Sequence, residues 1–316
     1  MYAYRRTGDR LHRLAVDEPV ESAVWIDLYR PQPDQAARIE ELGIDVPTFA
    51  DMEEIEISNR IYRDGTTDYM TVVMTGLTPE KESVLFPVAF ILTPERLVTV
   101  RYHAPRPLET FPDHADKTGI GCQNPDQVFL GLVQEIIARQ ADHLEGVGKS
   151  LDEVTRGVFG KTKQTDELLE LALEQAGRDG ELIGRLRLGL LTLERALSHF
   201  SQERGTSKAN GLKSHIKTLE RDIHALGVHA DFLSARLGHI TDVTLGLVNL
   251  SQNQTVRIVS VVAVLFLPPT LIASIYGMNF HAMPELDQPW GYPVALALML
   301  ASAVGTWAFF KWRRWL

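Results

Sequence analysis

Apolar residues are concentrated near the C-terminal end of this chain. No charged residue occurs from Ile258 to Phe280 or from Trp290 to Phe310. About 20 apolar residues in a helix that rises 1.5 Å per residue span the hydrocarbon core of a bilayer. A buried helix of that length in a soluble protein would normally carry a stripe of Lys or Glu. The pattern therefore predicts two transmembrane helices, over residues 258–276 and 290–310.

A regular apolar pattern also precedes the first of these runs. Between Leu212 and Pro268 there is no proline, and apolar residues recur at alternating steps of three and four. This spacing is typical of a helix that packs along one face. The positions are Ile216, Leu219, Ile223, Leu226, Ala230, Leu233, Leu237 and Ile240. We expect one helix from Leu212 to Tyr276, roughly 100 Å long, which forms a stalk continuous with the first transmembrane span.

The rest of the chain divides into two textures. Residues 126–159 and 166–202 repeat apolar positions at three and four, which predicts helices. Residues 22–28, 68–77, 84–92 and 96–103 are rich in β-branched and aromatic side chains, which predicts strands, and 34–43 predicts a helix. The many prolines and glycines of 105–125 predict a connector. We expect an α+β membrane protein with a mixed α/β domain over 1–125, a helical stalk region over 126–257 and a transmembrane hairpin with a basic tail over 258–316.

The average composition conceals this segregation, because 45% hydrophobic residues, 23% charged residues and a net charge of −9 would suit a soluble protein. The flanks of the apolar runs set the orientation. Arg257 precedes the first run and Lys311, Arg313 and Arg314 follow the second, whereas the only charged residues between the two runs are acidic. Basic flanks remain in the cytoplasm. We therefore expect a multi-pass protein of the inner or plasma membrane with both termini in the cytoplasm.

The first apolar run carries a stripe of small and polar residues. Two spans cannot enclose a polar path, so a transporter built from them must oligomerise. At about 100° per residue, one face of the run holds Ser260, Ala263, Leu267, Thr270 and Ser274, and its extension toward the stalk holds Asn253, Asn249 and Asp242. Such a stripe suits the wall of a shared pore. It equally suits an ordinary contact between membrane helices, and the pattern leaves both interpretations open.

The chemistry of the spans favours an ion that keeps its water. Neither span contains an acid or a base, so direct ligation of a bare ion by a carboxylate within the membrane is not expected. Magnesium dehydrates reluctantly and keeps several waters when it is bound. Gly277 is suited to end the helix, and Asn279 then offers an amide oxygen at the outer mouth. Glu285 and Asp287 would raise the local concentration of cations, although each also suits an ordinary solvated loop charge.

Several of these residues resemble the signature of the CorA family of magnesium and cobalt transporters. The matching segments are YGMNF (276–280), MPEL (283–286), GYP (291–293) and the preceding QNQTVRIVSVVAVLFLPPTLIAS. The segments AVWIDL and DMEEIE are similar to the N-terminal domain of that family. The resemblance covers nearly the whole chain and is most specific at its C-terminal end.

This resemblance implies a homopentamer with a funnel-shaped cytoplasmic domain, in which the first spans line the pore and the second spans face lipid. It implies an outer selectivity site for hydrated divalent ions at Gly277, Met278 and Asn279. The pore-lining positions that correspond are Asn253, Val259, Leu267 and Thr270. The family also carries regulatory magnesium between its cytoplasmic domains. Here Asp222 resembles the stalk ligand, while Glu80, Glu82 and Asp242 are further candidates.

We therefore expect a channel or transporter that carries Mg²⁺, and also Co²⁺ or Ni²⁺, into the cell. Its partners would be the bilayer and other copies of the chain, with no nucleic acid and no cofactor beyond Mg²⁺ as transported and regulatory ion. One alternative is a zinc or cobalt transporter of the same fold, which His281 would favour and the intact GMN sequence disfavours. Another is a two-span sensor or tether without transport. No phosphate-binding loop or nucleophile motif is present, so an enzyme is not expected.

Overall fold

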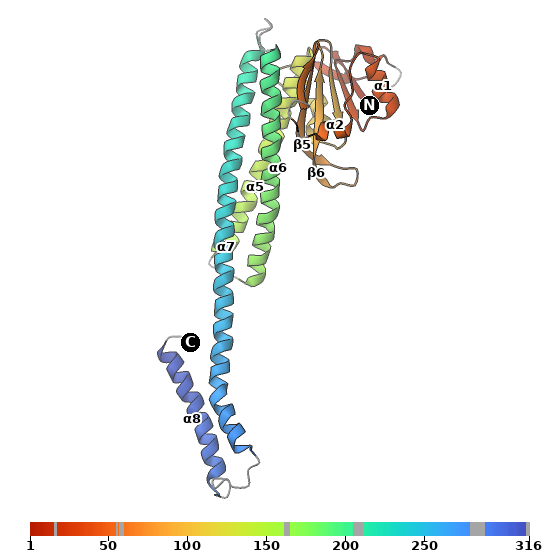
Figure 1. The fold of residues 1–316 in the computed structure, drawn as a ribbon. Helices are drawn as coiled ribbons and strands as arrows, with labels where there is room; N and C mark the ends of the chain where they lie inside the picture. The colour runs from red at the N-terminus through yellow and green to blue at the C-terminus, as the bar shows by residue number, and fades with distance from the viewer. Residues whose placement is uncertain are drawn as a thin grey trace. The chain divides into compact units, whose positions relative to one another are not determined.

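The structure is a computed structural model of the 316-residue chain. It describes residues 1–15, 18–54, 56, 60–160, 165–204, 211–278 and 288–313. The chain divides into two compact units. Unit 1 comprises Met1–Thr162 and Ala172–Ile240, and unit 2 comprises Lys163–Leu171 and Thr241–Leu316. Figure 1 shows the elements of both units.

Unit 1 is built on a seven-stranded sheet with the order β2-β1-β3-β7-β6-β5-β4. The central pair β3 and β7 is parallel, and the other neighbouring pairs are antiparallel. The bounds are β1 (Tyr2–Thr7), β2 (Arg10–Arg13), β3 (Trp25–Tyr29), β4 (Ile61–Asp64), β5 (Thr67–Leu77), β6 (Ser83–Leu92) and β7 (Leu97–Arg101). Both faces of the central strands are covered, which explains why these strands are almost continuously apolar.

Alternate residues of the strands enter two different cores. Trp25 and Phe90 lie in a core shared with the long helices, whereas their neighbours Ile26 and Ile91 lie in a second core. This alternation follows from the period of two along a strand. The second core includes residues of or next to α1 (Pro33–Glu40) and α2 (Phe49–Glu53). Two short 3-10 helices, Val20–Ser22 and Ala115–Lys117, complete the connections.

The larger core lies between the sheet and the helices α4 (Arg106–His114), α5 (Pro125–Phe159), α6 (Asp166–Arg204) and α7 (Leu212–Tyr276). In Figure 1 the unit 1 segments of α5, α6 and α7 lie side by side next to the sheet. Phe111 of α4, Phe129 of α5, Phe200 of α6 and Ile216 of α7 are all buried in this core. The end of the sheet that carries β4 is thus held by chain segments that are far apart in sequence.

Most of the predicted elements of unit 1 are present. The strands predicted at 22–28, 68–77, 84–92 and 96–103 correspond to β3, β5, β6 and β7, and the helix predicted at 34–43 corresponds to α1. The prediction of a connector over 105–125 was wrong, because α4 occupies its first half. Pro105 caps this helix and Pro107 stands in its first turn, where a missing N–H breaks no helical hydrogen bond. The prolines therefore mark the start of a helix.

The predicted packing face of α7 is also confirmed, and its partners belong to the same chain. Ile216, Leu219, Ile223, Ala230, Leu233 and Ile240 are each no more than 4% exposed. The first three share a core with Leu190, Leu193 and Leu197 of α6. Contact is close enough that a Cβ added at Gly180 of α6 would lie 3.0 Å from Leu237 Cδ2. This seam is therefore occupied within one copy of the chain.

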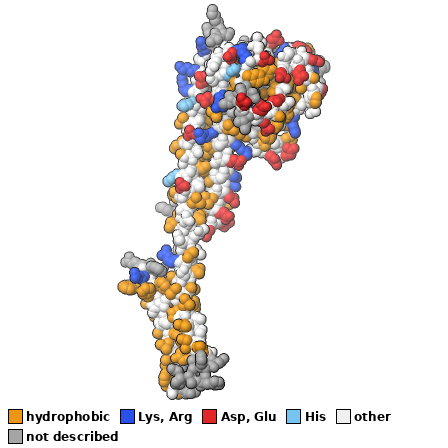
Figure 2. Space-filling view, in the orientation of Figure 1, with side chains coloured by type: hydrophobic (Ala, Val, Ile, Leu, Met, Phe, Trp, Pro, Cys, Tyr) orange, Lys and Arg blue, Asp and Glu red, His pale blue; other side chains and the backbone are white. Residues whose placement is uncertain are grey.

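Unit 2 contains the end of α7 and the helix α8 (Gly291–Trp312). Both helices have the length and the composition to cross a membrane, with mean hydropathy of 2.4 and 1.8 over their most apolar segments. Only 6% and 11% of those segments is buried, so neither is the core helix of a soluble unit. In Figure 2 their apolar side chains form a nearly continuous orange band with Lys and Arg at one end. These features suit a membrane hairpin.

Candidate functional site

The predicted pore residues form one exposed strip along α7. Val259 is 63% exposed and Leu267 is 64% exposed. The other members of the strip, Asn253, Ser260, Ala263, Thr270 and Ser274, are exposed as well. All seven lie in unit 2. A helix in lipid that leaves such a strip uncovered offers it to lipid, to a water-filled path or to another subunit.

The side of α7 that faces α8 lies elsewhere. Val261 is buried, while Leu265, Pro268 and Ile272 are half-buried. At about 100° per residue, these positions centre roughly 150° around the helix from the strip. Val261 lines one groove together with Phe310 of α8, which identifies this side as the one toward α8. The strip is therefore not the contact between the two helices of one hairpin.

The hydroxyl groups of the strip are satisfied within their own helix. Ser260 Oγ donates a hydrogen bond to Val256 O at 2.8 Å, and Thr270 Oγ1 donates to Phe266 O at 2.7 Å. Each hydroxyl oxygen keeps its lone pairs as acceptors. The waters around a cation turn their hydrogens outward, so acceptors are what a hydrated cation needs from a wall. These two residues supply such acceptors without a buried charge.

Helix α7 ends immediately before the GMN sequence. The Gly277 N–H donates to Ala273 O at 2.9 Å, and the Met278 N–H donates to Ile275 O at 3.3 Å, which tightens the last turn. A Cβ at Gly277 would lie 3.1 Å from Ala273 O, so the close approach favours glycine here. Met278 is 47% exposed. Asn279, His281, Glu285 and Asp287 lie outside the residues that the structure describes.

The candidate regulatory residues are all exposed. Asp222, Glu80 and Glu82 belong to unit 1, and Asp242 belongs to unit 2. Hydrogen bonds from its own backbone N–H and from the Thr78 hydroxyl lower the pKa of Glu80, so this carboxyl is ionised at neutral pH. Over the described ranges of the chain, no three His, Cys, Asp or Glu residues form a group suited to a metal ion. A site that uses these residues would need a ligand from another copy.

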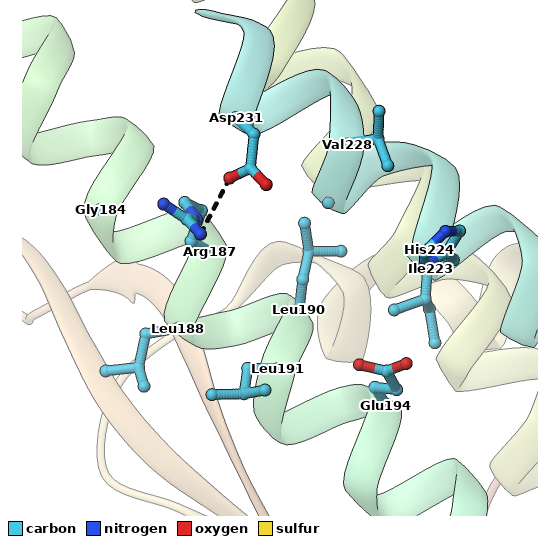
Figure 3. A pocket seen from close by; sticks show the side chains of 11 residues that line it. Gly184, Arg187, Leu188, Leu190, Leu191, Glu194, Ile223, His224, Val228 and Asp231 are labelled. Carbon is cyan, nitrogen blue, oxygen red and sulfur yellow. Dashed lines mark ion pairs between the residues drawn. The ribbon is translucent and has the colours of Figure 1, made fainter. Parts of the chain in front are cut away.

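A second exposed apolar surface lies on unit 1, between α6 and α7. Leu188 and Leu191 of α6 and Val228 of α7 are 43%, 44% and 57% exposed. They line a groove of about 510 Å³ that Figure 3 shows, next to the ion pair between Arg187 and Asp231 at 2.8 Å. We did not predict this surface from the sequence. Its apolar residues lie outside the regular seam, and their exposure depends on how α6 and α7 pack.

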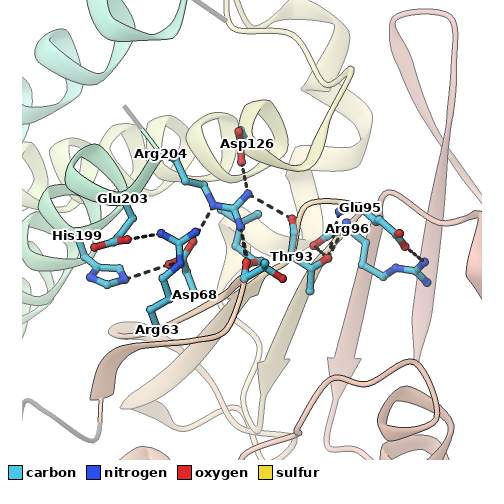
Figure 4. Close-up of polar contacts among 11 residues, drawn as sticks. Arg63, Asp68, Thr93, Glu95, Arg96, Asp126, His199, Glu203 and Arg204 are labelled. Atoms are coloured by element: carbon cyan, nitrogen blue, oxygen red, sulfur yellow. Dashed lines mark hydrogen bonds and ion pairs between the residues drawn. The ribbon is translucent and has the colours of Figure 1, made fainter. Parts of the chain in front are cut away.

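A buried polar cluster holds the end of α6 against the sheet (Figure 4). Arg204 Nε donates to Asp68 Oδ2 at 2.7 Å, and its Nη1 pairs with Asp126 Oδ1 at 3.0 Å. The Asp68 side chain is fully buried and also lies near Arg63 and His199. Arg204 further donates to Leu92 O at 2.8 Å. Removal of Arg204 would leave a buried carboxylate with weaker partners, which fixes where α6 ends.

Comparison with known sequences covers nearly the whole chain. The sequence profile of the family described as CorA-like Mg²⁺ transporter protein matches residues 20–313. The magnesium transport protein CorA of Escherichia coli is 32% identical over 317 residues, which cover 99% of this chain and 99% of that protein. The protein of the same name from Yersinia pseudotuberculosis is 31% identical, with the same coverage.

Comparison with solved structures shows the same fold. The complete structure of the CorA magnesium transporter from Methanocaldococcus jannaschii has a TM-score of 0.74 and 19% identity, and the match covers 100% of this chain and 98% of that chain. The ZntB cytoplasmic domain from Vibrio parahaemolyticus has a TM-score of 0.55 and 9% identity, and the match covers 79% of this chain and 98% of that chain. At these identities the likeness concerns the fold alone.

Proposed function

Because the chain belongs to the CorA-like Mg²⁺ transporter family, we propose that it forms a homopentamer that admits hydrated Mg²⁺ into the cell. Members of this family are transporters and not enzymes, and Mg²⁺ is their cargo. The two apolar helices of unit 2 suit the two spans that such a protein needs. The finer features of this proposal are the membrane orientation, the ion path, the filter and the gate.

The proposed orientation places both termini in the cytoplasm, in the inner or plasma membrane. It is supported by Arg257, Lys311 and Arg313 at one end of the hairpin and by the lack of Lys and Arg between the two helices. The cytoplasmic portion would then comprise the α/β domain over 1–125 and the stalk region over 126–257, and residues 258–316 would form the membrane part.

The observation that carries the proposed ion path is the exposed strip of α7 on the side away from α8. Copies of α7 arranged around one axis would present this strip to a shared path and leave α8 toward lipid. Its hydroxyl and amide oxygens would accept hydrogen bonds from the waters of the ion, and Val259 and Leu267 would form apolar constrictions between them. Subunit contacts would be completed in unit 1 by exposed apolar surfaces such as the groove of Figure 3.

The proposed filter is the set Gly277, Met278 and Asn279, in which the end of α7 at Gly277 presents the asparagine amide at the outer mouth. Glu285 and Asp287 would concentrate cations there. Neutral oxygens that contact the water shell distinguish weakly between hydrated divalent ions of similar size. We therefore expect Co²⁺ and Ni²⁺ to pass as well as Mg²⁺.

Flux into liposomes tests the filter. Purified protein in liposomes with a trapped Mg²⁺ indicator is expected to admit Mg²⁺, and Asn279→Ala is expected to abolish the signal. Gln254→Ala is the matched control, because it removes an amide from α7 on the side of the helix away from the strip and should preserve uptake. Unchanged uptake by Asn279→Ala would overturn the filter. Faster uptake of Zn²⁺ than of Mg²⁺ at physiological concentrations would favour the zinc alternative, and no flux would favour a sensor or tether.

The proposed gate is Mg²⁺ bound between subunits by acids such as Asp222, Asp242, Glu80 and Glu82. When internal Mg²⁺ is low, the facing carboxylates would lose their bridging ion and repel each other, and the stalks would move. Asp222→Ala is expected to weaken the inhibition of uptake by Mg²⁺ inside the liposome, whereas Asp142→Ala on α5 should leave it unchanged. Identical inhibition curves for Asp222→Ala and the unmodified protein would remove Asp222 from the gate.

A further inference from the structure

Unit 2 contains a groove between α7 and α8 that the ion path does not use in full. Its volume is about 460 Å³, within the range of roughly 300–1,000 Å³ typical of small-molecule sites. One wall is apolar, with Val261 and Val264 of α7 and Phe310 of α8, and Arg257 lies at its cytoplasmic-facing end in the proposed orientation. An arginine at the end of an apolar groove suits a molecule with an anionic head and an apolar tail.

The positive charge at this end of the hairpin has no acidic counterpart nearby. Arg257, Lys311 and Arg313 gather there, and no Asp or Glu occurs over residues 243–284 or 288–316. Within the part of the chain that the structure describes, no carboxylate forms an ion pair with Arg257. Figure 2 shows the Lys and Arg side chains at one end of the apolar band. A net anion from outside the chain would balance this charge.

The two cations of α8 are placed on either side of the groove wall. Lys311 Nζ lies 4.6 Å from the ring centroid of Trp307, and the guanidinium of Arg313 lies 6.0 Å from that of Phe309. At about 100° per residue, Lys311 and Arg313 flank Phe310 on opposite sides of α8. Their stems thus rest on aromatic rings at the depth of a membrane interface, and their charges extend toward the headgroup layer.

We propose that this groove binds one anionic phospholipid of the inner leaflet. The headgroup phosphate pairs with Arg257, and one acyl chain lies along Val261, Val264 and Phe310. Asn253 and Ser260, which line the same groove, are available to the ester and glycerol oxygens. A zwitterionic lipid brings its own cation and leaves the positive charge unbalanced, so selectivity for an anionic headgroup is expected. This inference requires a membrane hairpin and is independent of the ion path, the filter and the gate.

Lipid binding to the full-length protein in neutral detergent tests the proposal. Delipidated protein is titrated with phosphatidylglycerol or phosphatidylcholine of identical acyl chains, and bound lipid is counted by native mass spectrometry. We expect phosphatidylglycerol to bind at least about fivefold more tightly, the effect of one Lys or Arg near an anionic headgroup. Arg257→Gln should remove this preference and Arg257→Lys should retain it. Arg221→Gln, which removes an exposed arginine of α7 in unit 1, should leave it unchanged.

Further arms separate the alternatives. Val264→Trp fills the groove and should weaken both lipids, and Leu300→Trp on the exposed side of α8 should not. Inorganic phosphate at the same concentration should not displace phosphatidylglycerol, and displacement would overturn the assignment to a lipid. Equal binding of both lipids by the unmodified protein, as expected if another subunit covers the groove, would also overturn it. So would a preserved preference in Arg257→Gln with an unchanged elution volume and thermal midpoint.

Discussion

The two units of the chain satisfy their polar groups in opposite ways. In unit 1 the partners come from distant parts of the sequence, as in Asp27 with Arg101 and Asp68 with Arg204. In unit 2 the hydroxyls of Ser260, Thr270, Ser302 and Thr306 each donate to a carbonyl three or four residues earlier in the same helix. The one exception among these described contacts of unit 2 is a bond from Ser251 Oγ to Asp166 Oδ1 at 2.6 Å.

This difference follows from the solvents that the units suit. In water, a buried charge is tolerated only when a partner compensates it, so unit 1 acquires a specific tertiary arrangement. In lipid, each helix must complete its own hydrogen bonds, so the helices of unit 2 remain satisfied when they shift against their neighbours. A unit of the first kind holds a fixed shape, whereas a unit of the second kind allows a path to widen or close without the loss of hydrogen bonds.

The largest predicted effect tests the buried pairs of unit 1. Arg101 Nη2 lies 2.9 Å from Asp27 Oδ2, and the two side chains are 3% and 2% exposed. Arg101→Met would leave Asp27 buried without its cation, at a cost of about 3–5 kcal/mol. We expect the thermal midpoint in detergent to fall by about 10 °C. Arg178→Met, which breaks an ion pair of a 61% exposed arginine, should change it by less than about 2 °C. Equal effects would break the comparison.

The next effect tests how tightly the helices of unit 1 pack. A Cβ at Gly131 of α5 would lie 2.7 Å from the ring of Phe111, so Gly131→Ala forces this core apart. We expect it to lower the free energy of unfolding by about 1–3 kcal/mol. Gly146→Ala on the same helix meets no atom within 4 Å and should stabilise the helix by up to about 1 kcal/mol. Thermal midpoints of the two variants should move in opposite directions, and stabilisation by both would show a loose core.

Acid should destabilise unit 1 through His103. This side chain is fully buried, its Nε2 lies 2.9 Å from Met74 O, and burial lowers its pKa to about 4. Because the unfolded chain binds the proton more readily, stability is complete above about pH 6.5 and is lost as the pH falls toward 4. The loss is about 2 kcal/mol at pH 5. His103→Gln, which retains a donor for Met74, should show a smaller fall in thermal midpoint from pH 7 to pH 5. His224→Gln at an exposed position should behave as the unmodified protein does.

The smallest effect concerns unit 2. Ser302 Oγ donates to Met299 O at 2.8 Å within α8, so Ser302→Ala leaves no partner stranded. The expected loss of stability is below about 0.5 kcal/mol, and the thermal midpoint should be almost unchanged. Thr306→Val, which removes a similar bond to Ser302 O, should agree. A loss as large as that of Arg101→Met would show that these hydroxyls reach a second segment, and would remove the contrast between the units.

The sequence was sufficient to predict the elements whose patterns are strong and continuous. The alternating steps from Ile216 to Ile240 predicted the packing face of α7, and the charge-free runs predicted the two apolar helices. The long apolar strands β5 and β6 were equally clear. These features depend on local periodicity, which a single sequence displays directly. The family resemblance then added the functional interpretation of the GMN segment.

Other features depend on packing that a single sequence does not display. Strands β1 and β2 are short and rich in arginine, so they lack an apolar alternation. Helix α4 begins among prolines that also mark loops. The pairs of Asp27 and Asp68 join residues 74 and 136 positions apart. The stripe on α7 left a pore wall and a helix contact equally open, and only the position of α8 shows which side of the helix is free of it.

The most direct test of the central claim is the accessibility of the α7 strip during Mg²⁺ uptake. Cys122 is the only cysteine and is buried, so single cysteines can be introduced without interference. Liposomes that contain Thr270→Cys or Ile272→Cys are treated with a membrane-impermeant cationic thiol reagent while Mg²⁺ uptake is recorded. We predict that uptake through Thr270→Cys is blocked and that uptake through Ile272→Cys, on the side toward α8, continues. Blockage of Ile272→Cys alone, or of both at the same rate, would contradict an ion path along the exposed strip.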